Sequence, residues 1–237
     1  MKPRPSSSRI RWVRPPRQKR SERTLHRLLD AAERLLDRKT FDELTVQDVV
    51  KAAKSSVGSF YARFADKEAL LAALYDRHQE EAGATVSAAV DRERWRGTPL
   101  PEIVREIVRF TLRLYRSHRG LLRALVLRGH ARPDPRYRDP KQRSRTAIAE
   151  VGALLASRSE EIGHPDPKLA ASLGYLSVLA TAREKLLFGD STASAVAVSD
   201  HELEEELTRA YLAYLHVKPP RGAARKNPTR RAHGRNA

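Results

Sequence analysis

The feature that most constrains this chain is the stretch 44–71, which reads LTVQDVVKAAKSSVGSFYARFADKEALL. Thr45 precedes an apolar run and has Asp48 three residues later, a spacing that predicts a capping box at the start of a short helix. Ser56 is a good N-cap for a second short helix, and Asp66 is a good N-cap for a third. Two short helices joined by a turn of this length match the helix-turn-helix unit.

The apolar residues of this stretch recur at helical spacing and predict one buried face. That face comprises Val46, Val49, Val50, Ala53, Phe60 and Phe64. Gly58 lies between them, although glycine inside a helix costs about 1 kcal/mol relative to alanine. Its missing side chain makes sense if the start of the second helix must approach another surface closely. Spacing alone fits a chance helix-turn-helix equally well, because many small helical proteins contain one.

The residue identities go further, since they closely resemble the N-terminal DNA-binding domain of TetR/AcrR-family transcriptional regulators. The resemblance covers about residues 21–75. It rests on Thr45, Val46, Asp48, Val49, Ala53, Ser56, Gly58, Ser59, Phe60, Tyr61, Phe64, Lys67, Glu68 and Leu70. Two departures stand out: Lys54 and Ser55 occupy turn positions where the family often has Gly and Val, and Thr40 stands where it often has Gly.

The resemblance implies that the start of the second short helix faces DNA. We expect Val57 and Ser59 to touch base edges, with Gly58 allowing the close approach, while Tyr61 and Lys67 bind phosphates and set the register. The expected DNA-binding set, in which Thr45 is a further phosphate contact, is Thr45, Lys54, Ser55, Ser56, Val57, Gly58, Ser59, Tyr61 and Lys67.

The net charge of +17 is concentrated at the two ends of the chain. Residues 1–27 contain ten Lys or Arg and one acidic residue, and residues 218–237 contain seven and none, which leaves the middle nearly neutral. We expect 1–20 and 218–237 to be disordered basic arms, because neither can bury a core. The first arm adjoins the expected DNA-binding domain and is suited to phosphate or minor-groove contact; a solvated tail without a specific role is the alternative.

The remaining sequence predicts an all-α chain of about nine helices without useful strand alternation. Besides the helix-turn-helix, the expected helices are 21–39, 66–90, 101–118, 121–129, 140–161, 168–188 and 200–217. We expect a helix-turn-helix domain at 21–67 and a larger helical domain at 68–217. The last two helices are long and strongly apolar, which fits an intramolecular core. The resemblance implies in addition that 168–188 and 200–217 form a four-helix bundle in a homodimer.

The resemblance also implies a cavity for a mostly apolar small-molecule effector in the larger domain. The candidate lining residues, each of which could equally be ordinary core, are Phe110, Leu114, Tyr115, His118, Leu125, Tyr137, Tyr175, Leu179 and Arg183. Among these, Arg183 interrupts an apolar helix, where a surface ion pair with Glu184 is the simpler interpretation.

Signatures of other chemistry are missing from the sequence. It contains no Cys, no nucleophile elbow, no phosphate-binding Gly-rich loop and no H-E-x-x-H motif, and its eight His form no ligand pair. We therefore expect no enzyme, no metal site and no cofactor. No apolar run approaches the roughly 18 residues of a membrane span, and the basic N-terminus lacks the apolar region of a signal peptide, so we expect a cytoplasmic protein without membrane contact.

These observations favour a sequence-specific transcriptional regulator that binds double-stranded DNA as a homodimer on a palindromic operator and acts as a ligand-responsive repressor. Two alternatives remain open. A non-specific nucleic-acid-binding or architectural protein would bind through its basic arms, regardless of sequence. An all-α ligand-binding protein or enzyme with a vestigial helix-turn-helix would bind a ligand tightly, or turn it over, and have no DNA affinity.

Overall fold

The computed structural model describes residues 19–131, 140–189 and 196–217. Within these residues all regular secondary structure is helical, and the one β-type contact is an isolated antiparallel bridge between Ile162 and Val217, which confirms the all-α prediction. Its helices are α1 (Lys19–Leu36), α2 (Val46–Ala52), α3 (Val57–Tyr61), α4 (Lys67–Val90), α5 (Leu100–Ser117), α6 (Arg119–Ala131), α7 (Pro140–Ala156), the 3₁₀ turn η2 (Ser159–Glu161), α8 (Pro167–Leu187) and α9 (Asp200–Leu215).

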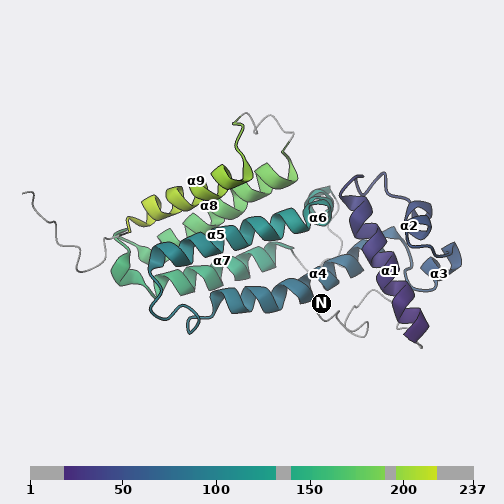
Figure 1. The fold of residues 1–237 in the computed structure, drawn as a ribbon, viewed down its shortest axis with the longest axis horizontal. Coiled ribbons are helices and arrows are strands. Elements are labelled where there is room, and N and C mark those ends of the chain that lie inside the picture. Colours follow the sequence, from purple (N-terminus) through teal and green to yellow (C-terminus); the bar gives the residue numbers. More distant parts are fainter. Residues whose placement is uncertain (1–18, 132–139, 190–195, 218–237) are drawn as a thin grey trace, which may run out of the picture.

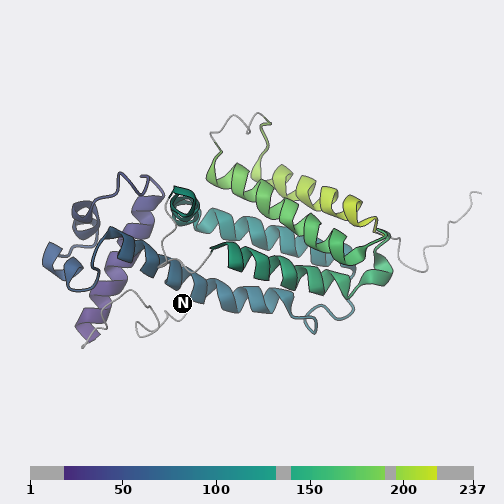
Figure 2. The ribbon, with the colours of Figure 1, turned by 180° about the vertical axis from the view of Figure 1, so that it is seen from behind.

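The molecule is elongated, with two groups of helices joined by α4 (Figure 1). Helices α1, α2 and α3 gather at one end, and α5, α7, α8 and α9 lie side by side at the other end. Figure 2 shows from behind that α4 runs from the first group along the second, and that α6 lies between them. We call α1–α3 with the first half of α4 the head, and α5 and α7–α9 the body.

Each group has its own apolar core. The head core surrounds Leu28, Phe60 and Phe64, and also takes Leu121 and Leu125 from α6. The body core surrounds Ile103 and Leu155 and continues into α8 and α9. Because α6 supplies buried side chains to the head core, a displacement of α6 relative to α1 would expose apolar surface on the head.

The predicted helix bounds agree with the structure to within two or three residues, with one correction. The expected single helix 140–161 ends at Ala156 and is followed by a turn and then by η2. The Ser157 hydroxyl donates a 2.6 Å hydrogen bond to the Leu154 carbonyl, and Arg158 N–H bonds to Leu155 O, so the backbone tightens into a turn there. Serine side chains compete in this way with helical backbone hydrogen bonding. Tyr137 and both basic arms lie outside the described residues.

A polar network joins the head to the start of α6. Arg77 on α4 is buried and bonds through its two terminal nitrogens to Asp30 Oδ1, at 2.6 Å, and to Glu33 Oε2, both on α1. His118, at the corner between α5 and α6, places Nδ1 2.9 Å from Glu33 Oε1. Burial acts to raise the pKa of Glu33, but the His118 hydrogen bond and the Arg77 charge outweigh it and the pKa is lowered. Glu33 therefore remains ionised, and it links three helices.

Gly120 makes the contact between α6 and α1 unusually close. A Cβ at this position would lie 2.3 Å from the Leu36 carbonyl carbon and 2.6 Å from the Asp37 nitrogen. The Gly120 N–H donates a 3.2 Å hydrogen bond to Asp37 Oδ1. The first turn of α6 is thus pressed against the end of α1 by backbone-to-backbone contact, which only glycine permits.

Candidate nucleic-acid interface

The two helices of the helix-turn-helix begin at capped residues, as the sequence predicts. Thr45 and Asp48 form a reciprocal capping box at the start of α2, and Ser56 Oγ accepts a 3.1 Å hydrogen bond from Ser59 N–H at the start of α3. The Lys39 ammonium lies 3.0 Å from Asp48 Oδ2. Hydrogen bonds from Lys39 and then Thr45 lower the pKa of Asp48 to about 2. The cap is therefore a charge-assisted interaction at neutral pH.

The turn between α2 and α3 is a Schellman motif. Ser55 N–H bonds to Val50 O at 2.9 Å, and Lys54 N–H bonds to Lys51 O at 3.2 Å. Lys54 occupies the left-handed region with φ of 48°. Glycine is the usual residue at this position of the motif. The turn therefore forms although Lys54 replaces the glycine that the family often has. It forms with Lys54 in a backbone conformation that is unfavourable for any residue with a Cβ.

Helix α3 is anchored from one side and open on the other. Phe60 is fully buried and packs on Phe64 with a ring-centroid distance of 5.2 Å. On the opposite side Gly58 is exposed, and a Cβ added there would meet nothing within 4 Å. Val57 is half-buried against the head core. Phe60 therefore fixes α3 to the head core, and no part of the described chain covers the opposite side of α3 at Gly58.

The expected phosphate-binding side chains lie in three different settings. Tyr61 is 49% exposed, and its ring packs edge-on against Phe60. Thr45 uses its hydroxyl in the α2 cap, where it donates to Asp48 Oδ2 at 2.9 Å. Lys67 donates from Nζ to the carbonyls of Phe41, at 2.8 Å, and Asp42, at 3.3 Å, which ties α4 to the loop before α2. Tyr61 therefore has the most available polar group of the three.

Arg63 belongs to this unit but is not prominent in the sequence pattern. It is 9% exposed and donates from Nη1 to Ser59 O at 2.6 Å, so it satisfies a carbonyl at the end of α3. Burial, with the charge of Arg27, lowers the pKa of its guanidinium. The sequence signal for this contact is that Arg63 lies four residues after Ser59, because residues four apart share a helix face.

Thr40 explains how the chain tolerates the loss of the glycine that the family often has before Phe41. Its backbone N–H and its hydroxyl both donate to Glu43 Oε2 at 2.9 Å. These bonds form a local turn with φ outside the left-handed region, so no glycine is required.

The nine expected pocket residues are distributed over the two cores and the joint, by which we mean the contact of His118 and Gly120 with α1. Leu125 is buried in the head core, and His118 bonds to Glu33 and packs edge-on against His78 at a centroid distance of 4.3 Å. Arg183 is exposed on α8. Tyr137 lies outside the described residues. In the body, Tyr175 is buried with its hydroxyl 3.3 Å from Thr111 Oγ1.

The other body residues of that set are partly buried on α5 and α8: Phe110, Leu114, Tyr115 and Leu179. Burial raises the pKa of both Tyr115 and Tyr175. The structure thus brings Tyr115, Tyr175 and Leu179 to one apolar region of the body and separates Leu125 and His118 from them. That these residues form an effector pocket stays a prediction.

The family comparison covers most of the described chain. Residues 28–74 match the model described as "Bacterial regulatory proteins, tetR family", and residues 99–215 match "Tetracyclin repressor-like, C-terminal domain". Together with the capped helix-turn-helix on a helical body, these matches define a DNA-binding regulator that carries a DNA-binding domain and a second helical domain in the same chain. The chain belongs to the TetR family of bacterial transcriptional regulators, which are DNA-binding proteins and not enzymes.

Solved structures show the same fold at low sequence identity. A TetR-family regulator from Mesorhizobium loti aligns with a TM-score of 0.60 at 19% identity, over 83% of this chain and 98% of that one. GusR of Salmonella enterica aligns with 0.54 at 20% identity, over 81% and 95%. AibR, solved with isovaleryl coenzyme A and operator DNA, aligns with 0.57 at 18% identity, over 79% and 97%. A comparison with curated proteins gives no match.

Membrane spans and metal sites are both absent from the described residues. Within residues 19–131, 140–189 and 196–217, no helix combines the length and the apolar character that a membrane span requires. Within the same described ranges, no group of three or more His, Cys, Asp or Glu side chains is placed to hold a metal ion.

Proposed function

We propose that this protein is a ligand-responsive repressor that binds a palindromic operator in cytoplasmic DNA as a homodimer. The observation that carries the proposal is the geometry of α3. Its inner side is fixed by Phe60, while its first turn at Ser56–Ser59 presents small side chains and the exposed backbone of Gly58. A recognition helix needs this arrangement, because its N-terminal residues must reach base edges without steric obstruction.

The exposed apolar face of α8 supports the homodimer. Leu169, Leu173 and Leu176 are 53%, 42% and 46% exposed, although they recur at helical spacing on one stripe. On α9, by contrast, Leu203 and Leu215 are buried within the chain. Three neighbouring exposed leucines on a long helix form a surface that a second copy would cover. A two-fold dimer would present two α3 helices to successive turns of the major groove, roughly 34 Å apart.

The proposed effector response follows from the joint between body and head. AibR, which has this fold, was solved with both an acyl coenzyme A and operator DNA. In this chain, α6 is joined to α1 through Gly120 and through the hydrogen bond between His118 and Glu33. An effector in the body would move the heads through this joint, and only to the extent that it binds the two arrangements with different affinity.

The decisive experiment is selection of bound duplexes from a random DNA pool at physiological salt. It is run with the full chain and with a variant that lacks residues 1–20 and 218–237. We expect both proteins to enrich the same palindrome, because α3 reads the bases and the arms add only sequence-independent attraction. Tyr61→Phe, which keeps the ring packed on Phe60 and removes the hydroxyl, should weaken binding to that palindrome severalfold.

Binding without enrichment, lost when the arms are removed, would replace this proposal with non-specific nucleic-acid binding. Absence of binding by either protein would favour an all-α ligand-binding protein in which the helix-turn-helix is vestigial. Both results are distinguishable from a folding failure, because the circular dichroism of the two proteins reports their helical content independently.

A further inference from the structure

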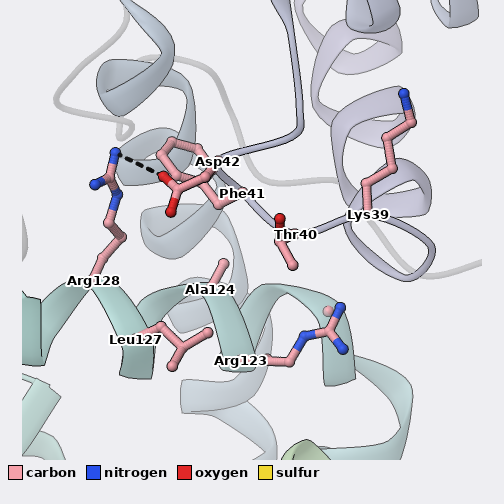
Figure 3. A pocket seen from close by; sticks show the side chains of 9 residues that line it. Lys39, Thr40, Phe41, Asp42, Arg123, Ala124, Leu127 and Arg128 are labelled. Carbon is pink, nitrogen blue, oxygen red and sulfur yellow. Dashed lines mark ion pairs between the residues drawn. The ribbon is translucent and has the colours of Figure 1, made fainter.

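A hollow of about 260 Å³ lies between the head and α6, away from the body residues considered above. One wall is the loop that follows α1, and the other is the exposed side of the first turns of α6 (Figure 3). The residues around it are Lys39, Thr40, Phe41, Asp42, Gly120, Arg123, Ala124, Leu127 and Arg128. The hollow therefore touches both parts of the joint.

The floor of the hollow is apolar. Phe41 and Ala124 are almost fully buried, and Leu127 is 50% exposed. In Figure 3 the Ala124 side chain rises from α6 toward Phe41, and the Leu127 side chain lies along the near side of α6. Among the large apolar side chains described on α6, Leu127 is the strongly exposed one. An apolar group placed against this floor would remove from water chiefly the exposed surface of Leu127.

Two of the three lining cations are already neutralised by carboxylates. Arg128 lies 2.6 Å from Glu68 Oε1 and 3.5 Å from Asp42 Oδ1, and its guanidinium stacks over the Phe41 ring at 4.9 Å. Lys39 pairs with Asp48 and extends away from the hollow in Figure 3. Because both cations are paired with carboxylates, they contribute little net positive charge to the hollow.

Arg123 differs from them. Within the described chain its guanidinium makes one long hydrogen bond, 3.4 Å from Nη2 to Leu36 O, and no carboxylate oxygen lies within ion-pair distance. The nearby Glu43 carboxylate is held by Thr40, and the charge of Arg123 contributes only the smallest of the effects that lower the Glu43 pKa. In Figure 3 Arg123 lies below Thr40, at the opposite end of the hollow from Arg128. It thus offers guanidinium donors at the edge of an apolar floor, which is the geometry that binds a carboxylate.

We propose that this hollow is a binding site for a small organic carboxylate with a flat or branched apolar body. The body of the ligand packs on Phe41, Ala124 and Leu127, and its carboxylate pairs with Arg123. The volume limits the ligand to a small acid, because larger ligands occupy pockets of roughly 300–1,000 Å³. The site is separate from the effector cavity expected in the body, and it does not depend on DNA binding.

The test is isothermal titration of the full-length protein with cinnamate and, separately, with cinnamyl alcohol, which has the same apolar body without the charge. We expect saturable binding of cinnamate with a dissociation constant on the order of 0.1–1 mM. The alcohol should bind at least about tenfold more weakly, since a charge-assisted hydrogen bond to Arg123 is lost.

Two variants locate the binding site. Arg123→Met keeps the length of the side chain and should weaken cinnamate binding about tenfold or more. Leu127→Trp adds bulk at a half-exposed position, which the fold tolerates, and should abolish binding by filling the hollow. Arg105→Met removes the same charge from an exposed position on α5 and should leave cinnamate binding unchanged.

The proposal is overturned if cinnamate shows no saturable binding. It is also overturned if Arg123→Met and Leu127→Trp, with unchanged thermal melts, bind cinnamate as the unaltered protein does. Binding that is lost equally in Arg105→Met would indicate a general charge effect and would equally reject the site.

Discussion

At the scale of single residues, Lys54 carries a local conformational cost that another residue would avoid. Its φ of 48° lies in the left-handed region, which costs a residue with a Cβ about 1–2 kcal/mol. We predict that Lys54→Gly raises the free energy of unfolding by up to about 1 kcal/mol, after the larger unfolded-state entropy of glycine is taken into account. Urea denaturation of the two proteins measures the change.

Lys54→Ala is the matched comparison for this prediction. It removes the same charge but keeps a Cβ in the left-handed conformation, so it should bring no comparable gain in stability. If Lys54 also contacts a DNA phosphate, both variants should reduce the salt dependence of operator binding by about one unit of slope. Equal stabilities of the two variants would show that the conformation at this residue is not the cause.

Asp48 gives a prediction about pH. Its pKa is lowered from 3.8 to about 2, so its contribution to stability is complete above pH 3.8 and is lost as the pH falls through about 2. We predict that unaltered protein melts at a higher temperature than Asp48→Asn at pH 6, and that this gap stays nearly constant down to about pH 4 and narrows between about pH 4 and pH 2. Thermal melts followed by circular dichroism measure the gap. A gap that stays constant over this range would mean that the ionised cap does not stabilise the fold.

At the scale of helices, the closeness of α6 to α1 depends on the absence of one methyl group. Gly120→Ala would place a Cβ 2.3 Å from the backbone of Leu36, so α6 must move away from α1. We predict a loss of about 1–3 kcal/mol in the free energy of unfolding, as for other overpacked sites. Denaturant unfolding monitored by circular dichroism checks this loss.

Gly58→Ala is the control, because the same methyl group meets nothing within 4 Å on α3. Its effect on stability should be neutral or favourable by up to about 1 kcal/mol, since alanine is the better helix former. If α3 approaches DNA as proposed, this variant should nevertheless lose affinity for the selected palindrome. Similar stabilities for the two glycine variants would contradict the tight contact between α6 and α1.

At the scale of the whole molecule, the exposed leucines of α8 decide the oligomeric state. We predict that Leu173→Glu converts a dimer into a monomer, because a charge at the centre of an apolar interface would be buried without a partner. Sedimentation velocity at micromolar concentration measures the molecular mass. The monomer should also lose most of its affinity for the palindrome while its melting behaviour changes little, since Leu173 is exposed within one chain.

Ala149→Glu on the exposed surface of α7 is the control for an added charge, and it should leave the mass unchanged. A Leu173→Glu protein that keeps the mass of a dimer would show that α8 is not the dimer interface. A monomeric unaltered protein at the same concentration would contradict the homodimer itself.

The sequence by itself determined the features that depend on local interactions. The capping residues Thr45, Ser56 and Asp66 hydrogen-bond to amides three residues ahead, so the starts of α2, α3 and α4 could be read without knowledge of the rest of the chain. Helical periodicity likewise located most helix bounds and the head core. The end of α7 before Ser157 was not predicted, because an apolar pattern that continues past a serine does not show that the backbone has turned.

Only the tertiary structure decided features that join distant residues. Arg77 and Glu33 meet across α4 and α1, Gly120 lies against Leu36, and Arg123 shares a hollow with Phe41. No local pattern encodes these contacts, since each depends on how two helices pack. The same reason separates His118 and Leu125 from the rest of the expected pocket: periodicity predicts that an apolar side is buried, and packing decides which core it enters.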